Sequence, residues 1–142
     1  MNEHTRKLLE DARNKKFDYV SIALDYDDID INASAAFGRT VLHYASMHDW
    51  PSIIIRILSK FDANINVRDK SGRTTLNYAA DNYNYECMII LLARKDIKVN
   101  VKDDDGNTAL HYSAKKNDPQ SMKILLEHQD INVNIQDKIV RS

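Results

Sequence analysis

Hydrophobic residues recur along this chain at the spacing of short helices. In three runs, apolar side chains fall at positions i, i+3 and i+4, which form one face of a helix. These side chains are Ile54, Ile57 and Leu58; Met88, Leu91 and Leu92; and Met122, Leu125 and Leu126. A shorter helical run precedes each of the three. The pattern predicts two helices in each of three similar units.

Polar turns separate these units. The three glycines of the chain end the turns at a spacing of 34 residues: Gly38, Gly72 and Gly106. Glycine suits a backbone position with a positive φ angle. The threonine found two residues after each glycine is a favoured N-cap. Pro51 and Pro119 stand where the second helix should begin, which suits a residue without an N–H. Each unit is expected to close with an extended segment of alternating residues.

The repeated core identifies a family resemblance. The segments GRTVLHYA, GRTTLNYA and GNTALHYS resemble the G-x-T-P-L-H-x-A core of ankyrin repeats, with Val41, Thr75 and Ala109 in place of the proline. A 34-residue period is also that of tetratricopeptide repeats, but their W-x-x-L-G-x-x-Y pattern is absent. The resemblance implies an all-α solenoid of about four helix-turn-helix units joined by short hairpin-like turns.

We expect one domain covering residues 1–142. Its expected units are an N-terminal capping repeat at 1–36, repeats at 37–70 and 71–104, and a C-terminal repeat at 105–138. Terminal repeats need polar outer faces. Asp11 stands in the register of Ala45 and Ala79, and Ser121 and Lys123 replace apolar residues of the inner units. The turn at 137–140 lacks glycine, so no further standard unit is expected after it.

Composition and charge exclude several classes of partner. The net charge of −1 gives no bulk attraction to nucleic acid or to a membrane surface. No apolar run reaches the roughly 18 residues of a membrane span. The first residues are charged and lack the apolar stretch of a secretory signal, and one cysteine cannot form an internal disulfide. We expect a monomer in the cytoplasm, of its own cell or of a host cell.

Candidate catalytic and metal-binding residues have simpler structural interpretations. His43 and His111 lie two repeats apart, about 20 Å at the usual helix spacing, which is too far to share a metal. The acidic turn from Asp103 to Gly106 resembles a calcium loop, but Val101 and Tyr112 hold its first and twelfth positions, which favours a solvated turn. Cys87 is predicted to be a buried thiol. We expect no enzyme activity, no cofactor and no metal.

Three asparagines recur in the closing segments: Asn66, Asn100 and Asn134. They resemble sites that asparaginyl hydroxylases modify in ankyrin proteins. The favoured interpretation of their presence is that the side-chain amides satisfy backbone groups of the turns. Whether any of the three is hydroxylated stays open.

The resemblance also implies a contact surface, because repeat proteins bind partners on a continuous concave face. The contact positions implied at the turns are Phe37, Arg39, Lys70, Ser71, Arg73, Asp104, Asp105 and Asn107. Those implied at the ends of the first helices are Met47, His48, Asp81, Asn82, Lys115 and Lys116. Tyr44, Tyr78 and Tyr112 recur at one position of the first helix. They either line this groove or pack between adjacent repeats.

The expected function is therefore a non-catalytic module that binds a partner protein, of unknown identity, through its concave face. Three alternatives stay open. The chain could be an inhibitor or regulatory subunit that occludes an enzyme, or the recruiting arm of a longer enzyme. It could also be an effector from an intracellular microbe or virus that acts on a host protein.

Overall fold

The computed structural model describes residues 1–134 of the chain, and within them it contains eight α-helices and no strand. The helices form four consecutive pairs. They are α1 (Glu3–Arg13) and α2 (Phe17–Ala23); α3 (Val41–Met47) and α4 (Pro51–Lys60); α5 (Thr75–Asp81) and α6 (Tyr85–Leu92); and α7 (Ala109–Lys115) and α8 (Pro119–Leu126). A short 3-10 turn, η1 (Ala36–Gly38), precedes α3. The prediction of an all-α repeat fold is confirmed.

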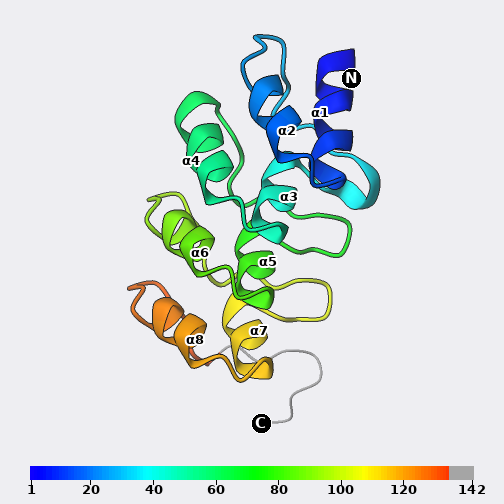
Figure 1. The fold of residues 1–142 in the computed structure, drawn as a ribbon. Helices are drawn as coiled ribbons and strands as arrows, with labels where there is room; N and C mark the ends of the chain where they lie inside the picture. The colour runs from blue at the N-terminus through cyan, green and yellow to red at the C-terminus, as the bar shows by residue number, and fades with distance from the viewer. Residues whose placement is uncertain (135–142) are drawn as a thin grey trace.

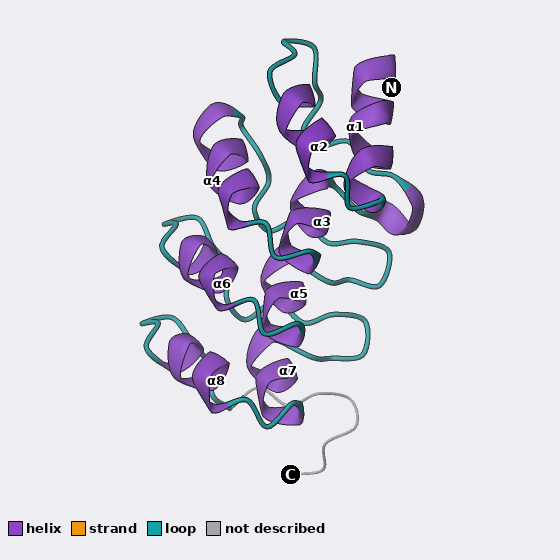
Figure 2. Cartoon of the chain, viewed as in Figure 1, coloured by secondary structure: helices purple, strands orange, loops and turns teal. Residues whose placement is uncertain are grey.

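The pairs stack into two layers (Figure 1). The first helices lie in one layer, where α1 packs on α3, α3 on α5 and α5 on α7. The second helices form the other layer, where α4 packs on α6 and α6 on α8. The loops between successive pairs all project on the same side, next to the first helices (Figure 2). This arrangement places the turn tips and the first-helix ends along one side of the molecule.

The helix starts follow the expected chemistry. Thr74 is the N-cap of α5: its N–H donates to Asn77 Oδ1 at 2.9 Å, and Asn77 N–H donates to Thr74 Oγ1 at 3.2 Å. Such reciprocal bonds satisfy two N–H groups that the helix itself leaves unpaired. The glycines have φ angles of 70°, 76° and 81°, as predicted. A second series with positive φ links the two helices of each pair: Lys15, Asp49, Tyr83 and Asn117.

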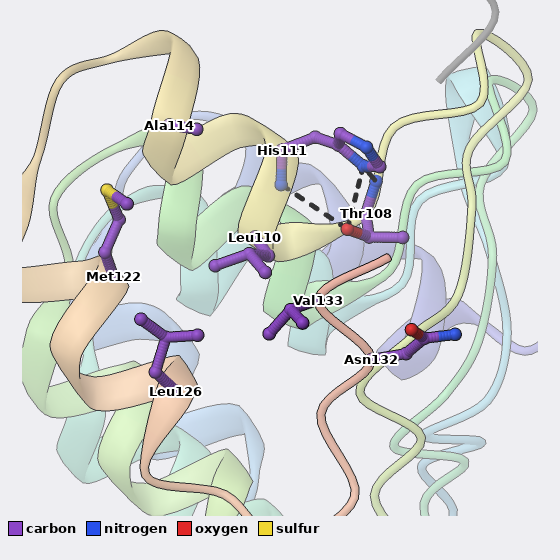
Figure 3. A pocket seen from close by; sticks show the side chains of 8 residues that line it. All are labelled: Thr108, Leu110, His111, Ala114, Met122, Leu126, Asn132 and Val133. Atoms are coloured by element: carbon purple, nitrogen blue, oxygen red, sulfur yellow. Dashed lines mark hydrogen bonds between the residues drawn. The ribbon is translucent and has the colours of Figure 1, made fainter. Parts of the chain in front are cut away.

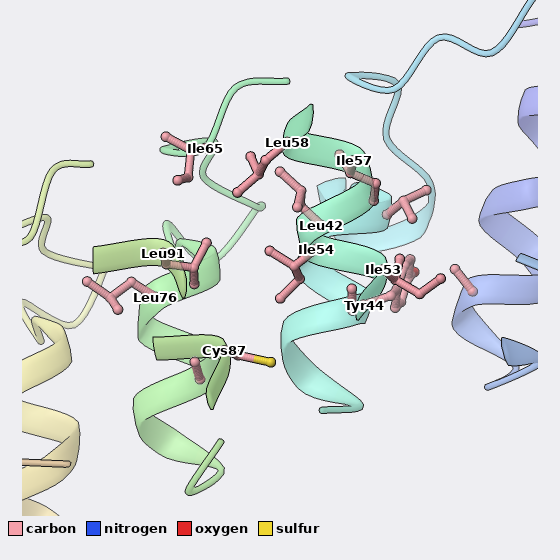
Figure 4. Packing of buried hydrophobic residues seen from close by; sticks show 14 of the residues in the cluster. Leu42, Tyr44, Ile53, Ile54, Ile57, Leu58, Ile65, Leu76, Cys87 and Leu91 are labelled. Carbon is pink, nitrogen blue, oxygen red and sulfur yellow. The ribbon is translucent and has the colours of Figure 1, made fainter. Parts of the chain in front are cut away.

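The core runs continuously between the units. Figure 4 shows residues of the second helices, such as Ile54 and Leu91, beside residues of the first helices, such as Leu42 and Leu76. Cys87 is fully buried in this core, as predicted, and burial raises the pKa of its thiol to about 12. A thiol with so high a pKa is almost entirely protonated at neutral pH, so it lacks the thiolate that reactive cysteines use.

The expectation about polar end faces is wrong for two residues. Asp11 is buried, and its carboxylate accepts a hydrogen bond from Lys7 Nζ at 2.8 Å. Ser121 is also buried, and its hydroxyl donates to Ser113 Oγ at 2.7 Å. Partners within the same repeat therefore satisfy both polar groups. The turn at 137–140 and the last residues of the expected C-terminal repeat lie outside the described residues.

The outward-facing positions of the second helices also differ from expectation. Lys123 is exposed, but so are Ile55 and Ile89 at the same register. Lys123 therefore marks a solvent-facing position common to several repeats and not a special end face. The two exposed isoleucines place apolar surface on the side away from the turns.

Candidate protein interaction surface

The predicted contact residues differ in how far their side chains reach solvent. The exposed ones are Phe37, Lys70, Ser71, Asn82, Asp104, Asp105, Lys115 and Lys116. The half-buried ones are Arg39, Met47, His48, Arg73 and Asp81. The buried ones are Tyr44, Tyr78, Asn107 and Tyr112. The first two groups are accessible to solvent, and we call them together the concave surface, after the contact face that the family resemblance implies.

The tyrosines do not line an open groove. The hydroxyl of Tyr78 donates to Asp69, and that of Tyr112 donates to Asp103. Burial raises the pKa of both hydroxyls. The ring of Tyr78 also meets the ring of His43 from the preceding repeat edge-on, with centroids 5.8 Å apart. Of the two interpretations left open by the sequence, packing between repeats is the one that the structure supports.

Asn107 is likewise removed from the accessible surface. Its N–H donates to Asp103 Oδ1 at 2.9 Å, and its side-chain oxygen accepts from Lys115 Nζ at 2.9 Å. Asp103 is itself buried, which corrects the expectation of a fully solvated acidic turn. Only Asp104 and Asp105 of that turn are exposed.

Asp69 and Asp103 hold their turns together in the same way. Asp69 Oδ1 accepts from the N–H of Ser71 at 2.9 Å and of Arg73 at 3.0 Å, while Oδ2 accepts from the Tyr78 hydroxyl. Burial alone would raise the pKa of Asp69, but the hydrogen bonds from Tyr78, Arg73 and Ser71 lower it overall. Each carboxylate therefore joins its turn to the helix that follows it, α5 for Asp69 and α7 for Asp103.

Two arginines lie over the tyrosine rings. The guanidinium of Arg39 is 5.2 Å from the ring centroid of Phe37 and 5.6 Å from that of Tyr78. The guanidinium of Arg73 is 5.5 Å from the centroid of Tyr78 and 5.2 Å from that of Tyr112. Cations at such distances are attracted to aromatic faces. The rings and arginines thus form a row that runs across three repeats.

Both arginines lie close to carboxylates without direct hydrogen bonds to them. Arg39 Nε is 3.7 Å from Asp69 Oδ2, and within the described residues this buried nitrogen has no hydrogen-bond partner. Arg73 lies 3.8 Å from Asp81 and 3.9 Å from Asp103, distances longer than a direct hydrogen bond. Long ion pairs and ring contacts hold both guanidinium groups in place without using all of their donors.

Tyr83 belongs to the same surface, although the sequence did not indicate it. It is 50% exposed, and Lys116 Nζ lies 5.8 Å from its ring centroid. Lys116 Nζ is also 3.5 Å from Asp81. The signal for Tyr83 was its place in the turn between two helices, where its counterparts in other repeats are polar. A large aromatic residue at an exposed turn is an exception to that pattern.

Phe37 is the most prominent apolar side chain of the concave surface. It is 60% exposed, and its φ angle is 65°, a conformation that bulky residues rarely adopt. Its carbonyl accepts from the N–H of Lys70 in the next turn at 2.9 Å, which fixes the tip. Backbone strain of this kind clusters at binding sites.

The histidines of the repeated motif have structural roles. His43 Nδ1 accepts from Thr40 N–H at 3.0 Å, so the neutral ring carries its proton on Nε2, which donates to the carbonyl of Arg73 at 2.9 Å. His111 Nδ1 accepts from Thr108 N–H at 3.0 Å. The sequence-based interpretation of both as structural residues is confirmed. Within residues 1–134, no group of three or more His, Cys, Asp or Glu side chains could hold a metal ion.

Acidification is expected to destabilise the fold through His43. Burial lowers its pKa, so the unfolded chain binds a proton more readily than the folded protein, and stability falls as pH decreases below about 6.5. Burial lowers the pKa of His48 in the same direction. In His43→Asn, which copies Asn77 of the next repeat, the loss between pH 7.5 and 5 should shrink by up to about 1.4 kcal/mol per pH unit. Urea unfolding of both proteins at the two pH values measures this, and equal losses would contradict it.

The asparagines form a ladder between repeats. Asn66 Nδ2 donates to the carbonyl of Asp96 at 2.7 Å, and its Oδ1 accepts from the N–H of Lys98 at 2.8 Å. Asn100 makes the same two bonds to Asp130 and Asn132, each at 2.8 Å. The interpretation that these amides satisfy backbone groups is confirmed for Asn66 and Asn100. The groups they satisfy belong to the following repeat.

A cavity of about 290 Å³ lies at the last described repeat (Figure 3). Leu110, Leu126 and Val133 line it, together with the Thr108–His111 capping pair. In the inner repeats the residues at the register of Val133 are Ile65 and Val99, and both are buried where successive repeats pack. The apolar lining of this cavity is therefore explained as a stacking face of the solenoid.

Comparison with known proteins agrees with this architecture. A family model described as "Ankyrin repeats (3 copies)" matches residues 8–103 and, in a second overlapping match, residues 54–137. No curated protein matches the chain. Among the described residues, no helix has the length and apolar character needed to cross a bilayer.

Proposed function

Because the chain belongs to the ankyrin-repeat family, we propose that it is a non-catalytic module that binds a partner protein through its concave surface. Ankyrin repeats are generally protein–protein interaction modules. The row of arginine and aromatic side chains is the observation that carries the proposal for this surface. The module is proposed to act as a monomer.

The row has the properties of an interaction hot spot. Arginine and aromatic residues dominate the binding energy of many interfaces. Here Arg39 and Arg73 are held between rings and ion pairs, so less side-chain entropy is lost when a partner binds. Exposed Phe37 adds an apolar anchor at the tip of the first turn.

Charge changes along the concave surface, from basic at one end to acidic at the other. Arg39 and Lys70 make the region around Phe37 basic, whereas exposed Asp104 and Asp105 make the third turn acidic. A partner with the opposite gradient is expected to bind in one orientation. Electrostatic complementarity of this kind contributes to specificity and to the rate of association.

The test is a double substitution on the concave surface. Phe37→Ala combined with Arg73→Gln is expected to weaken partner binding by more than about tenfold, since each anchor contributes on the order of 1–2 kcal/mol. Glutamine is preferred to glutamate at position 73 because a carboxylate there would face Asp81 and Asp103. The affinity is measured by isothermal titration calorimetry with a partner captured from cell extract.

The matched control lies on the second helices. Ser59 and Glu86 are exposed on α4 and α6. Changing both to alanine is expected to leave the affinity within about twofold, because surface positions outside an interface contribute little. Loss of binding in this control, together with full binding by the concave variant, would place the interface on the second helices.

A further inference from the structure

The first turn lacks a side chain that the other two turns possess. Asp69 and Asp103 begin the second and third turns, and each accepts hydrogen bonds from two N–H groups of its turn and from a tyrosine hydroxyl. The residue at the same register in the first turn is Ala35. Its methyl group can accept none of these hydrogen bonds.

Tyr44 shows the consequence of this difference. It occupies the register of Tyr78 and Tyr112 and is equally buried. Within the described residues, however, its hydroxyl has no hydrogen-bond partner. Buried polar groups without a partner are uncommon, and each one calls for an explanation. The missing acceptor is the carboxylate that Ala35 does not supply.

A cavity is present at this place. It has a volume of about 220 Å³ and is lined by Ala35 together with Met1, Arg6, Leu9, Glu10 and Arg13 of the N-terminal segment. Leu9 holds the register of His43, whose ring packs against Tyr78. By the same register, Leu9 and Tyr44 correspond to the pair His43 and Tyr78. Because Ala35 lines the cavity, the cavity adjoins the position that the absent carboxylate would occupy, and its volume is large enough for an acidic side chain.

The cationic side chain at the cavity that can pair with an anion is Arg13. Arg6 is already paired with two carboxylates, those of Glu3 and, at 3.3 Å, of Glu10. Arg39, in the same turn as Ala35, does not line the cavity, because its Nε lies 3.7 Å from Asp69 of the next turn. The backbone of this turn also differs from that of the other two turns. Phe37 has a positive φ, whereas Ser71 and Asp105, at the same register, do not.

We propose that an aspartate or glutamate side chain of the partner protein enters this cavity and replaces the carboxylate missing at Ala35. The carboxylate accepts a hydrogen bond from the Tyr44 hydroxyl and is neutralised by Arg13. The exposed side chains of Met1 and Arg6 change rotamer to admit it. This proposal rests on the proposed function, and it identifies an acidic side chain as one determinant of the partner.

The first experiment uses the free protein. Ala35→Asp should raise the melting temperature, because the new carboxylate can bond to the Tyr44 hydroxyl and to the turn N–H groups, as Asp69 does in its own turn. Tyr44→Phe should then lower the melting temperature more in the Ala35→Asp background than in the wild type. An Ala35→Asp protein that melts at or below the wild-type temperature would overturn the proposal.

The second experiment measures binding. Short random peptides displayed on phage are selected on the full chain, and the binders are synthesised for affinity measurements. The expected binders contain an Asp or Glu whose replacement by Asn or Gln weakens binding about tenfold. Ala35→Asp should cause a similar loss and should cause no further loss for the Asn or Gln peptide. Ala36→Asp, which adds the same charge to an exposed neighbouring residue, should have a much smaller effect.

The outcomes separate this proposal from the function on which it rests. If Ala35→Asp and Ala36→Asp have equal effects, or if the binders need no acidic residue, the acidic determinant is overturned. In that case, weakening of the same peptides by Phe37→Ala with Arg73→Gln would leave the concave surface in place. If no peptide responds to that double variant, the proposed function itself fails.

Discussion

Leu91→Ala is expected to lower the free energy of unfolding by about 2–5 kcal/mol. Leu91 is fully buried on α6, among residues that join the second and third repeats to their neighbours (Figure 4). Truncation removes apolar contacts and leaves a cavity that the stacked helices fill only in part. Small domains are stable by only about 5–15 kcal/mol, so this one change would remove a large fraction of the total.

The control for Leu91 lies two residues away on the same helix. Ile89 is 56% exposed, so Ile89→Ala is expected to change the free energy of unfolding by less than about 0.5 kcal/mol. Urea unfolding followed by circular dichroism measures both variants against the wild type. If the two variants lost similar amounts of unfolding free energy, Leu91 would not be on the core-facing side of α6.

Gly72→Ala is expected to cost about 1–3 kcal/mol. The φ angle of Gly72 is 76°, which disfavours any residue with a Cβ atom. A Cβ at this position would also lie 2.9 Å from the backbone nitrogen of Asp104, and that nitrogen is fixed by its bond to the carbonyl of Ser71. Side chains near the new methyl group can move aside, but the next turn of the solenoid cannot do so without losing that bond.

Two further variants separate backbone strain from a general effect of mutating the turn. Gly38→Ala meets its nearest backbone atom at 3.0 Å, so its cost should be somewhat smaller than that of Gly72→Ala. Ser71→Ala, at the exposed neighbouring position, should have little effect. Thermal unfolding measures all three. A Gly72→Ala protein as stable as Ser71→Ala would contradict the tight apposition of the turns.

The sequence was sufficient to predict the helices and the caps. Glycine, threonine and proline act locally, so their recurrence at one register predicted the turns with positive φ, the N-caps of the first helices and the start of α4 at Pro51. Regular apolar spacing identified the inner faces of α4 and α6; on α8, Leu125 is buried as expected, but Leu126 is exposed. These features depend on residues close in sequence, which is why a single chain was enough.

The sequence was insufficient where a side chain is satisfied by a particular partner. Asp11 and Ser121 were expected to face solvent, yet both are buried: exposed Lys7 pairs with Asp11, and buried Ser113 pairs with Ser121. Asp103 was expected to be solvated, yet Tyr112 and two backbone N–H groups bind its carboxylate. Residue type alone does not reveal such partners.

The tyrosines illustrate the same limit for the binding surface. Their register placed them on the side of the first helices, but only the positions of Asp69 and Asp103 showed that the hydroxyl groups of Tyr78 and Tyr112 are directed into the turns. Comparison with Asp69 then showed that Ala35 leaves the first turn without a carboxylate. In the sequence alone, Ala35 is one small residue in a variable turn.

Hydrogen exchange of the protein with and without its bound partner tests the concave surface most directly. Binding is expected to slow exchange at the amides of the first two turns, around Phe37, Arg39 and Arg73, and at the end of α5 near Asp81. The exposed side of the second helices, around Ile55 and Ile89, should exchange at an unchanged rate. Slowing confined to α4 and α6, with no change in the turns, would contradict binding at the concave surface.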